Sequence, residues 1–237
     1  MIGAVVAAGA KIAASNGGGA MRKVVIWDAP TRLFHWLTAV LVAAAYATWR
    51  FDRIDWHVWI GYALLALVIF RLLWGFLGSE TARFAGFVAS PRAAFAHLAH
   101  IFRREPDHQR GRNPAGGWMV LVLLVLLLGE ALTGVYINND IAVEGPLTEI
   151  VPAPLANLID ALHTALFWQA LLAAIALHLA AIAVYWVAKG QNLVLPMIDG
   201  RKALPIETRP PALAGPLRAL IVFGGSVVAA AAVINFL

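Results

Sequence analysis

The chain has 237 residues, of which 61% are hydrophobic and 13% are charged, and it contains no cysteine. Its mean hydropathy of +0.77 excludes an ordinary soluble domain, in which about a quarter of the residues are charged. The lack of cysteine excludes disulfides, iron–sulfur clusters, thiolate ligands and covalent c-type haem attachment. Any redox centre must therefore be held by other side chains.

Five apolar segments have lengths near the roughly 20 residues that cross a bilayer. They are residues 33–49, 57–77, 118–138, 158–188 and 217–237. Arginine and lysine gather between the second and third segments and after the fourth, whereas the other side carries Asp140, Glu144, Glu149 and Asp160. The positive-inside rule then predicts a multi-pass protein of the bacterial inner membrane, with its N-terminus in the cytoplasm and its C-terminus in the periplasm. The net charge of +5 reports this topology, and no nucleic-acid partner is expected.

The sequence predicts a division of the chain into three parts. Residues 1–22, rich in alanine and glycine, are expected to form a disordered N-terminal extension, with Met21 as a plausible start. Residues 23–202 form the main domain of four spans, and residues 203–237 form a linker and an extra transmembrane helix. Residues 91–104 are expected to form an amphipathic helix on the inner membrane face, where His97 and His100 either face water or bind a metal.

Four histidines lie in or beside the apolar segments, at His35, His57, His163 and His178. An imidazole is costly in hydrocarbon and normally has a partner or a function. In the fourth span His163 and His178 are separated by about 22 Å along the helix and by roughly 60° around it. One helix therefore offers a ligand at each of two levels, with His57 at the level of His163 and His35 at the level of His178.

This pattern predicts two b haems, each held by two histidines through its iron: His35 with His178, and His57 with His163. A zinc ion would instead need three or four ligands converging on one point. Each histidine taken singly is also compatible with hydrogen-bonded helix packing. The matched depths of the two pairs favour the haem interpretation.

The order of these histidines resembles the bacterial cytochrome b561 and nickel-hydrogenase cytochrome b family. The similar stretches are residues 27–36 (WDAPTRLFHW), 56–62 (WHVWIGY), 71–75 (RLLWG) and 113–119 (NPAGGWM). The resemblance extends over residues 23–202 and implies an all-α, four-helix transmembrane bundle with two non-covalent b haems. It further implies electron transfer across the membrane between a periplasmic redox partner and quinone.

Two features depart from the family pattern. The fifth, C-terminal transmembrane helix is additional, and the interval between His163 and His178 is about one residue longer than the family leads us to expect. A local π-bulge would absorb the extra residue.

Further candidate residues lie near the expected inner haem. Arg71 is about 21 Å deeper than His57, so it either pairs with a haem propionate or extends to the cytoplasmic face. Asn113, at the start of the third span, matches the place where related cytochrome subunits hold quinone; it is equally a helix-start signal. Gly61, Gly129 and Gly134 either admit the macrocycle or pack helices.

Glu130 is the one acidic residue expected near the bilayer centre, where an ionised carboxylate costs at least a few kcal/mol. Gln169, at a similar depth on the fourth span, is its predicted hydrogen-bond partner. A role in proton transfer is the alternative.

Three functions remain open from the sequence. The first is an electron-transfer subunit of an oxidoreductase, which passes electrons between quinone and a periplasmic c-type cytochrome or hydrogenase-like enzyme. The second is a stand-alone oxidoreductase that transfers electrons from superoxide to quinone; it needs a basic funnel at the outer haem, and the outer loops are acidic. The third is a membrane anchor without redox activity.

Overall fold

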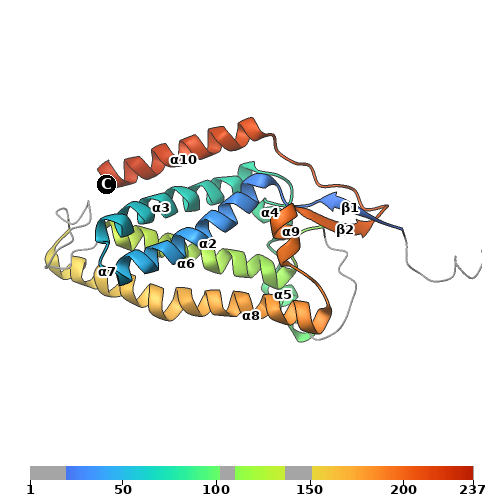
Figure 1. Ribbon diagram of the computed structural model, residues 1–237, viewed down its shortest axis with the longest axis horizontal. Helices are drawn as coiled ribbons and strands as arrows, with labels where there is room; N and C mark the ends of the chain where they lie inside the picture. Colours follow the sequence, from blue (N-terminus) through green and yellow to red (C-terminus); the bar gives the residue numbers. More distant parts are fainter. Residues whose placement is uncertain (1–19, 102–109, 137–150, 237) are drawn as a thin grey trace, which may run out of the picture.

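The computed structural model describes residues 20–101, 110–136 and 151–236. These residues form an elongated bundle of helices with a small two-stranded sheet at one end (Figure 1). We call this end the sheet end and the opposite end the far end. Most of the N-terminal extension, residues 102–104 of the amphipathic segment, and Asp140, Glu144 and Glu149 lie outside the described residues.

Helices α2 (Ala29–Arg50) and α3 (Ile54–Leu77) form an antiparallel pair that runs to the far end and back. The side chain of Asp28 starts α2 by accepting a hydrogen bond from the Thr31 amide at 2.8 Å. A proline in the first turn also favours this start. At the far end the chain turns through Asp52, whose φ of 56° lies in the left-handed region that an aspartate tolerates better than most residues.

Helix α6 (Pro114–Val135) returns from the sheet end to the far end, and a long continuous helix then leads back. This long helix consists of α7 (Ala153–Ala165), the π-helical turn η2 (Leu166–Leu171) and α8 (Leu172–Lys189). Asn113 caps α6, because its Oδ1 accepts from the Gly116 amide at 2.7 Å. The helices that carry the predicted histidines thus all run between the same two ends.

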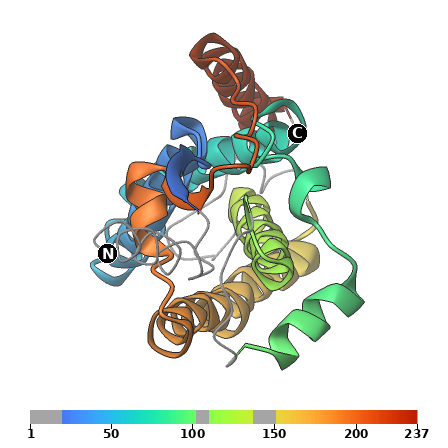
Figure 2. The same cartoon turned by 90° about the vertical axis from the view of Figure 1, so that its right-hand side faces the viewer.

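Helix α10 (Pro216–Phe236) packs along α3, on the side away from α8 (Figure 2). Its contact stripe has a period of four residues: Val222, Ser226 and Ala230 are buried, while much of the rest of the helix is exposed. Small residues on this stripe let the two helices approach closely. Only one face of α10 is therefore used inside this chain.

Four helical segments are long and apolar enough to cross a membrane, judged by length and composition in the described chain. They are α3, α6, the continuous α7–η2–α8 helix and α10. Helix α2 is not among them, because Arg32, His35 and Arg50 lower its hydropathy, although its 22 residues extend about 33 Å. The protein is thus an integral membrane protein of mostly helical fold, and the five-span topology stays a prediction.

The sheet end contains elements that the sequence did not predict. Strand β1 (Met21–Val25) pairs antiparallel with β2 (Arg201–Pro205), with Lys23 opposite Ala203. The short helices α4 (Phe84–Phe87) and α9 (Val194–Asp199) lie at the same end. Helix α5 (Pro91–Ala99), also at this end, corresponds to the amphipathic helix predicted over residues 91–104. The strands tie the start of α2 to the segment after α8, and Trp36 strengthens this link by donating to the Met197 carbonyl at 3.0 Å.

Candidate functional site

The four histidines form two pairs in the structure. His35 on α2 lies beside His178 on α8, with 6.3 Å between the ring centroids. His57 on α3 lies beside His163 on α7, with 6.4 Å between the centroids. We call these the sheet-end pair and the far-end pair. The two pairs are the same as those expected from the depths of the histidines along their helices.

The π-helical turn η2 lies between His163 and His178. A π-helix forms i→i+5 hydrogen bonds, so one such turn absorbs about one residue relative to an α-helix. The 15-residue interval then behaves like roughly 14 α-helical residues, which brings the two histidines to within about 40° of each other. The predicted π-bulge is confirmed, and its effect is to keep both histidines on one face of the long helix.

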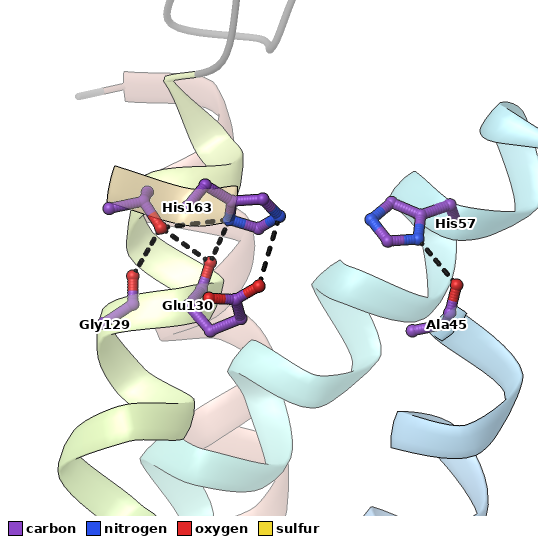
Figure 3. A network of polar contacts seen from close by, with 6 residues as sticks. Ala45, His57, Gly129, Glu130 and His163 are labelled. Atoms are coloured by element: carbon purple, nitrogen blue, oxygen red, sulfur yellow. Dashed lines mark hydrogen bonds and ion pairs between the residues drawn. The ribbon is translucent and has the colours of Figure 1, made fainter. Parts of the chain in front are cut away.

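Backbone carbonyls hold the rings of the far-end pair. His57 Nδ1 lies 2.9 Å from the carbonyl oxygen of Ala45, and His163 Nδ1 lies 3.0 Å from that of Glu130. A carbonyl only accepts, so each Nδ1 carries the hydrogen and each Nε2 keeps its lone pair. The two imidazoles point toward each other, with their ring planes nearly perpendicular at 85° (Figure 3). Nδ1–H bonded to a carbonyl is the usual arrangement of a metal-binding histidine.

Thr133 supplies a second acceptor to His163. Its hydroxyl donates to the Gly129 carbonyl at 2.7 Å, and its oxygen lies 3.0 Å from His163 Nδ1. The hydroxyl hydrogen is therefore used by the backbone of α6, which leaves an oxygen lone pair for the imidazole N–H. Thr133 was not predicted from the sequence, although a threonine four residues after Gly129 on the same helix face was the available signal.

A cavity separates the histidines of the far-end pair. It contains about 1340 Å³ of space not filled by protein atoms, part of it open to the surroundings. Its lining includes His57, His163, Gly61, Gly134, Tyr46 and Phe167. A Cβ added at Gly61 would meet no atom within 4 Å, whereas one at Gly134 would lie 3.1 Å from His163 Cε1. Gly134 therefore allows the imidazole to lie against α6, and Gly61 leaves the cavity wide.

Glu130 contacts the far-end pair and not Gln169. Its Oε1 lies 3.4 Å from His163 Nε2, and its Oε2 is buried without a hydrogen-bond partner in the described chain. No hydrogen bond joins it to Gln169 among the described residues, so that predicted partner is wrong. The π-helical turn, which contains Gln169, changes the facing of this part of the helix relative to an unbroken α-helix.

The sheet-end pair has a different environment. His35 Nδ1 is buried and lacks a hydrogen-bond partner in the described residues. Trp36 packs edge-on against the His35 ring at 5.0 Å. The Arg112 guanidinium is close enough to act electrostatically on His35. A buried nitrogen without a partner is expected at a site that binds a further group.

Two arginines lie against Phe87 beside this pair. Arg71 is 1% exposed; its Nη2 donates to the Ala82 carbonyl at 3.2 Å, while its Nη1 is buried without a partner in the described residues. Arg112 stacks on Trp27 at 4.4 Å and on Phe87 at 4.6 Å, the distances being measured to the ring centroids. Burial and the nearby charge of Arg71 lower the pKa of Arg112 to about 9, so it stays charged at neutral pH.

Asp28 is the acidic residue that acts on both arginines. Its two oxygens are already engaged, one by the Thr31 amide and the other by Trp74 Nε1 at 3.0 Å. No ion pair joins it to either arginine among the described residues. The arrangement leaves one buried positive charge uncompensated, which suits an anionic group bound here.

Asn113 has two local partners. Besides capping α6 through Oδ1, its Nδ2 donates to the Tyr185 hydroxyl at 2.7 Å. The same hydroxyl lies 2.5 Å from Nε2 of His97, which is on the amphipathic helix α5. The sequence analysis did not single out Tyr185. The sequence left His97 and His100 either facing water or binding a metal. Metal binding has no support in the described chain, which has no group of three or more potential metal ligands.

Comparison with known proteins gives one match. The family model described as prokaryotic cytochrome b561 matches residues 26–200. No curated protein and no solved structure matches the chain. Because the match covers most of the sequence, the chain belongs to the prokaryotic cytochrome b561 family. It is thus a membrane b-type cytochrome of electron transfer, and the family implies that it binds haem b.

Proposed function

We propose that this member of the cytochrome b561 family binds two b haems, one between His35 and His178 and one between His57 and His163. The spacing of the rings supports the proposal. A histidine nitrogen binds a transition metal at about 2 Å and lies about 1.2 Å from its ring centroid, so two axial histidines place their centroids roughly 6.4 Å apart. The observed 6.3 and 6.4 Å agree with this value.

The haems would supply one-electron transfer, and the chain positions them at two levels of the bundle. The far-end histidines are preorganised by their Nδ1 hydrogen bonds, so the Nε2 lone pairs are the ones available to iron. At the sheet end, Arg71 and Arg112 are the residues that would neutralise haem propionates. From the sequence, only Arg71 was proposed to pair with a haem propionate. Arg112 is a second such residue, and its position in an arginine-rich loop gave no sign of this role.

The quinone would bind at the sheet end, beside Asn113. One Nδ2 hydrogen of the amide is used by Tyr185 and one remains for a quinone carbonyl. Asn113→Asp keeps the capping oxygen and removes the donor, whereas Asn113→Leu removes both and costs about 1 kcal/mol of helix capping. If the donor matters, both variants slow haem oxidation by added quinone with both haem spectra intact. An unchanged rate in both variants would discard the role of Asn113.

The charge distribution supports an orientation with the sheet end in the cytoplasm. Arg83, Arg92, Arg110, Arg112, Lys189 and Arg201 are among the basic residues at this end. Arg50 and Arg53 at the far end are balanced by Asp52 and Asp55. With α2 counted as a span, five spans place the N-terminus in the cytoplasm and the C-terminus in the periplasm. The far-end haem would then exchange electrons with a periplasmic c-type cytochrome or a hydrogenase-like enzyme.

The spacing of the two histidine pairs carries this proposal, and haem analysis of the purified protein tests it. We expect a reduced-minus-oxidised spectrum of low-spin b haem and two haems per chain. A protein without haem would be a membrane anchor only. One haem per chain would restrict the proposal to a single pair, and the histidine variants described in the Discussion identify which pair remains.

A further inference from the structure

We propose that His97 and Tyr185 form the proton-transfer pair that serves the quinone at the sheet end. This inference rests on the proposed quinone site and adds the residues that handle protons there. Reduction of a quinone to a quinol consumes two electrons and two protons, and oxidation of the quinol releases them. Haem supplies or accepts the electrons only, so the protons require other groups at the same end.

Tyr185 lies on the side of α8 that carries His178. The two residues are seven positions apart, which is about 20° short of two full helical turns and roughly 10.5 Å along the axis. Tyr185 is buried, with 6% of its surface exposed. Its hydroxyl is therefore located between the sheet-end histidine pair and the cytoplasmic face proposed above.

The hydrogen bonds at Tyr185 define a route for a proton. Asn113 Nδ2 can only donate, so the Tyr185 oxygen accepts at 2.7 Å. The His97 Nε2 atom lies 2.5 Å from the same oxygen, so the phenol and the imidazole are in direct hydrogen-bond contact and a proton can pass between them without an intervening water. The two rings are nearly parallel, with an interplanar angle of 16°, which fixes their relative position.

His97 is the more exposed member of this pair. It is half-buried on α5, and His100, the C-cap residue of this helix, is exposed. The exposed part of His97 lets the pair exchange protons with water at the proposed cytoplasmic face. An imidazole is the side chain that most readily takes up and releases a proton near neutral pH. Among the described residues, the charged or titratable groups on or beside the same elements are Lys189, 5.6 Å from the Tyr185 ring centroid, together with Arg92, His100, Arg112 and His178.

During quinone reduction the Tyr185 hydroxyl gives its proton to a quinone carbonyl oxygen and receives one from His97, which is reprotonated from water. The other carbonyl oxygen, on the opposite side of the ring, takes its proton from water, and with two electrons from haem both carbonyl oxygens become hydroxyls. Quinol oxidation runs in reverse, with one proton passing out through Tyr185 and His97 and the other passing directly to water. General acid–base groups of this kind contribute about 10²–10⁴-fold to a rate.

The alternative role for the contact is mechanical, in which His97 only holds α5 against the bundle. Tyr185→Phe separates the two roles, because it keeps the ring and its stacking and removes the hydroxyl. His97→Gln removes the imidazole but keeps a polar side chain, and His100→Gln is the matched control, since His100 is exposed on the same helix and bonds only the Ala96 carbonyl in the described structure.

The experiment measures haem reduction by a short-chain ubiquinol or menaquinol, using the full chain with both haems in lipid vesicles, between pH 6 and 9. We expect Tyr185→Phe and His97→Gln to slow the reaction at least tenfold. Both should flatten its pH profile and reduce its solvent deuterium isotope effect. His100→Gln should behave like the unchanged protein, and haem content and spectra should be the same in all samples.

Three results would overturn the inference. A wild-type rate and pH profile in both Tyr185→Phe and His97→Gln would leave the pair with the mechanical role only. Loss of haem in both variants would make the pair part of the haem pocket. If the unchanged protein holds two haems that no quinol reduces and no quinone oxidises, the proposed quinone site itself fails, and the inference fails with it.

Discussion

The two histidine pairs have the same ligands and nearly the same ring spacing, but they differ in the charged and polar groups beside them. The sheet-end pair lies near the half-buried guanidinium of Arg112, with the buried Arg71 beside it on the same Phe87 ring. The far-end pair lies near the carboxyl groups of Glu130 and Asp160, and it faces a large cavity. The two histidine pairs therefore differ in the groups around them and not in the histidines themselves.

This difference has an expected consequence for redox chemistry. Reduction of a haem removes one positive charge, so cationic neighbours favour the reduced form and anionic neighbours favour the oxidised form. We therefore expect the sheet-end haem to have the higher reduction potential. Electrons arriving at the far end would then move toward the sheet end, where the quinone site is proposed.

The largest expected effect comes from removing one ligand of each pair. His178→Ala should lose the sheet-end haem and keep the far-end haem, and His163→Ala should do the reverse, because each iron loses one of its two axial ligands. Haem-to-protein ratio and a redox titration measure this, with the high-potential component missing only in His178→Ala. Two haems per chain in either variant would show that the pairing is wrong.

Removing the positive charge of Arg112 should sharpen the comparison. A unit charge roughly 10 Å from the iron, at an effective dielectric constant of about 20, is worth about 1.7 kcal/mol, or ~70 mV for a one-electron couple. Arg112→Gln should lower the potential of the sheet-end haem by an amount of that order and leave the other haem unchanged. Arg110→Gln is the matched control, because Arg110 is exposed and paired with Glu80 at 3.5 Å. Equal shifts in both variants would contradict a local effect.

Thr133→Val tests the far-end pair alone. The valine keeps the shape of the side chain and removes the oxygen that lies 3.0 Å from His163 Nδ1. A lost hydrogen-bond acceptor makes the imidazole a weaker electron donor and destabilises the oxidised haem. Because the Glu130 carbonyl remains as an acceptor, we expect the reduction potential of the far-end haem to rise by less than about 1 kcal/mol, or ~40 mV. A fall in potential, or a shift of the sheet-end haem, would refute this role.

The smallest expected effect concerns docking at the far end. If Glu144 and Glu149, which lie outside the described residues, help to attract a basic c-type cytochrome, Glu→Gln changes at both positions should slow electron transfer severalfold at low salt. Rising ionic strength should have the same effect in the unchanged protein, since the Debye length is about 10 Å at 0.1 M. Stopped-flow rates over a salt series measure it. A rate insensitive to both changes would favour a permanent membrane partner.

Helix periodicity allowed several features to be predicted from the sequence. The apolar segments correspond to α2, α3, α6, the α7–η2–α8 helix and α10, with ends shifted by a few residues. The depths of the histidines follow from a rise of 1.5 Å per residue along each helix. Even the π-helical turn was accessible, because one extra residue between His163 and His178 must be absorbed locally.

Contacts between distant parts of the chain could not be predicted from helix geometry. The pairing of β1 with β2 joins residues about 180 positions apart, and neither strand has a distinctive pattern by itself. Arg112 looked like one of several loop arginines, until the fold placed it between Trp27 and Phe87. Glu130 was assigned the wrong partner, because its contact with His163 depends on how α6 faces α7.

The sequence by itself determined the membrane class, the helical segments and the levels of the four histidines, since composition and helical rise act along the chain and need no partner. The tertiary structure alone decided which polar groups surround each histidine pair. Rotation of one packed helix by a fraction of a turn brings a different side chain to the site. For this reason no local sequence pattern predicts the two arginines around Phe87 or the contact of His97 with Tyr185.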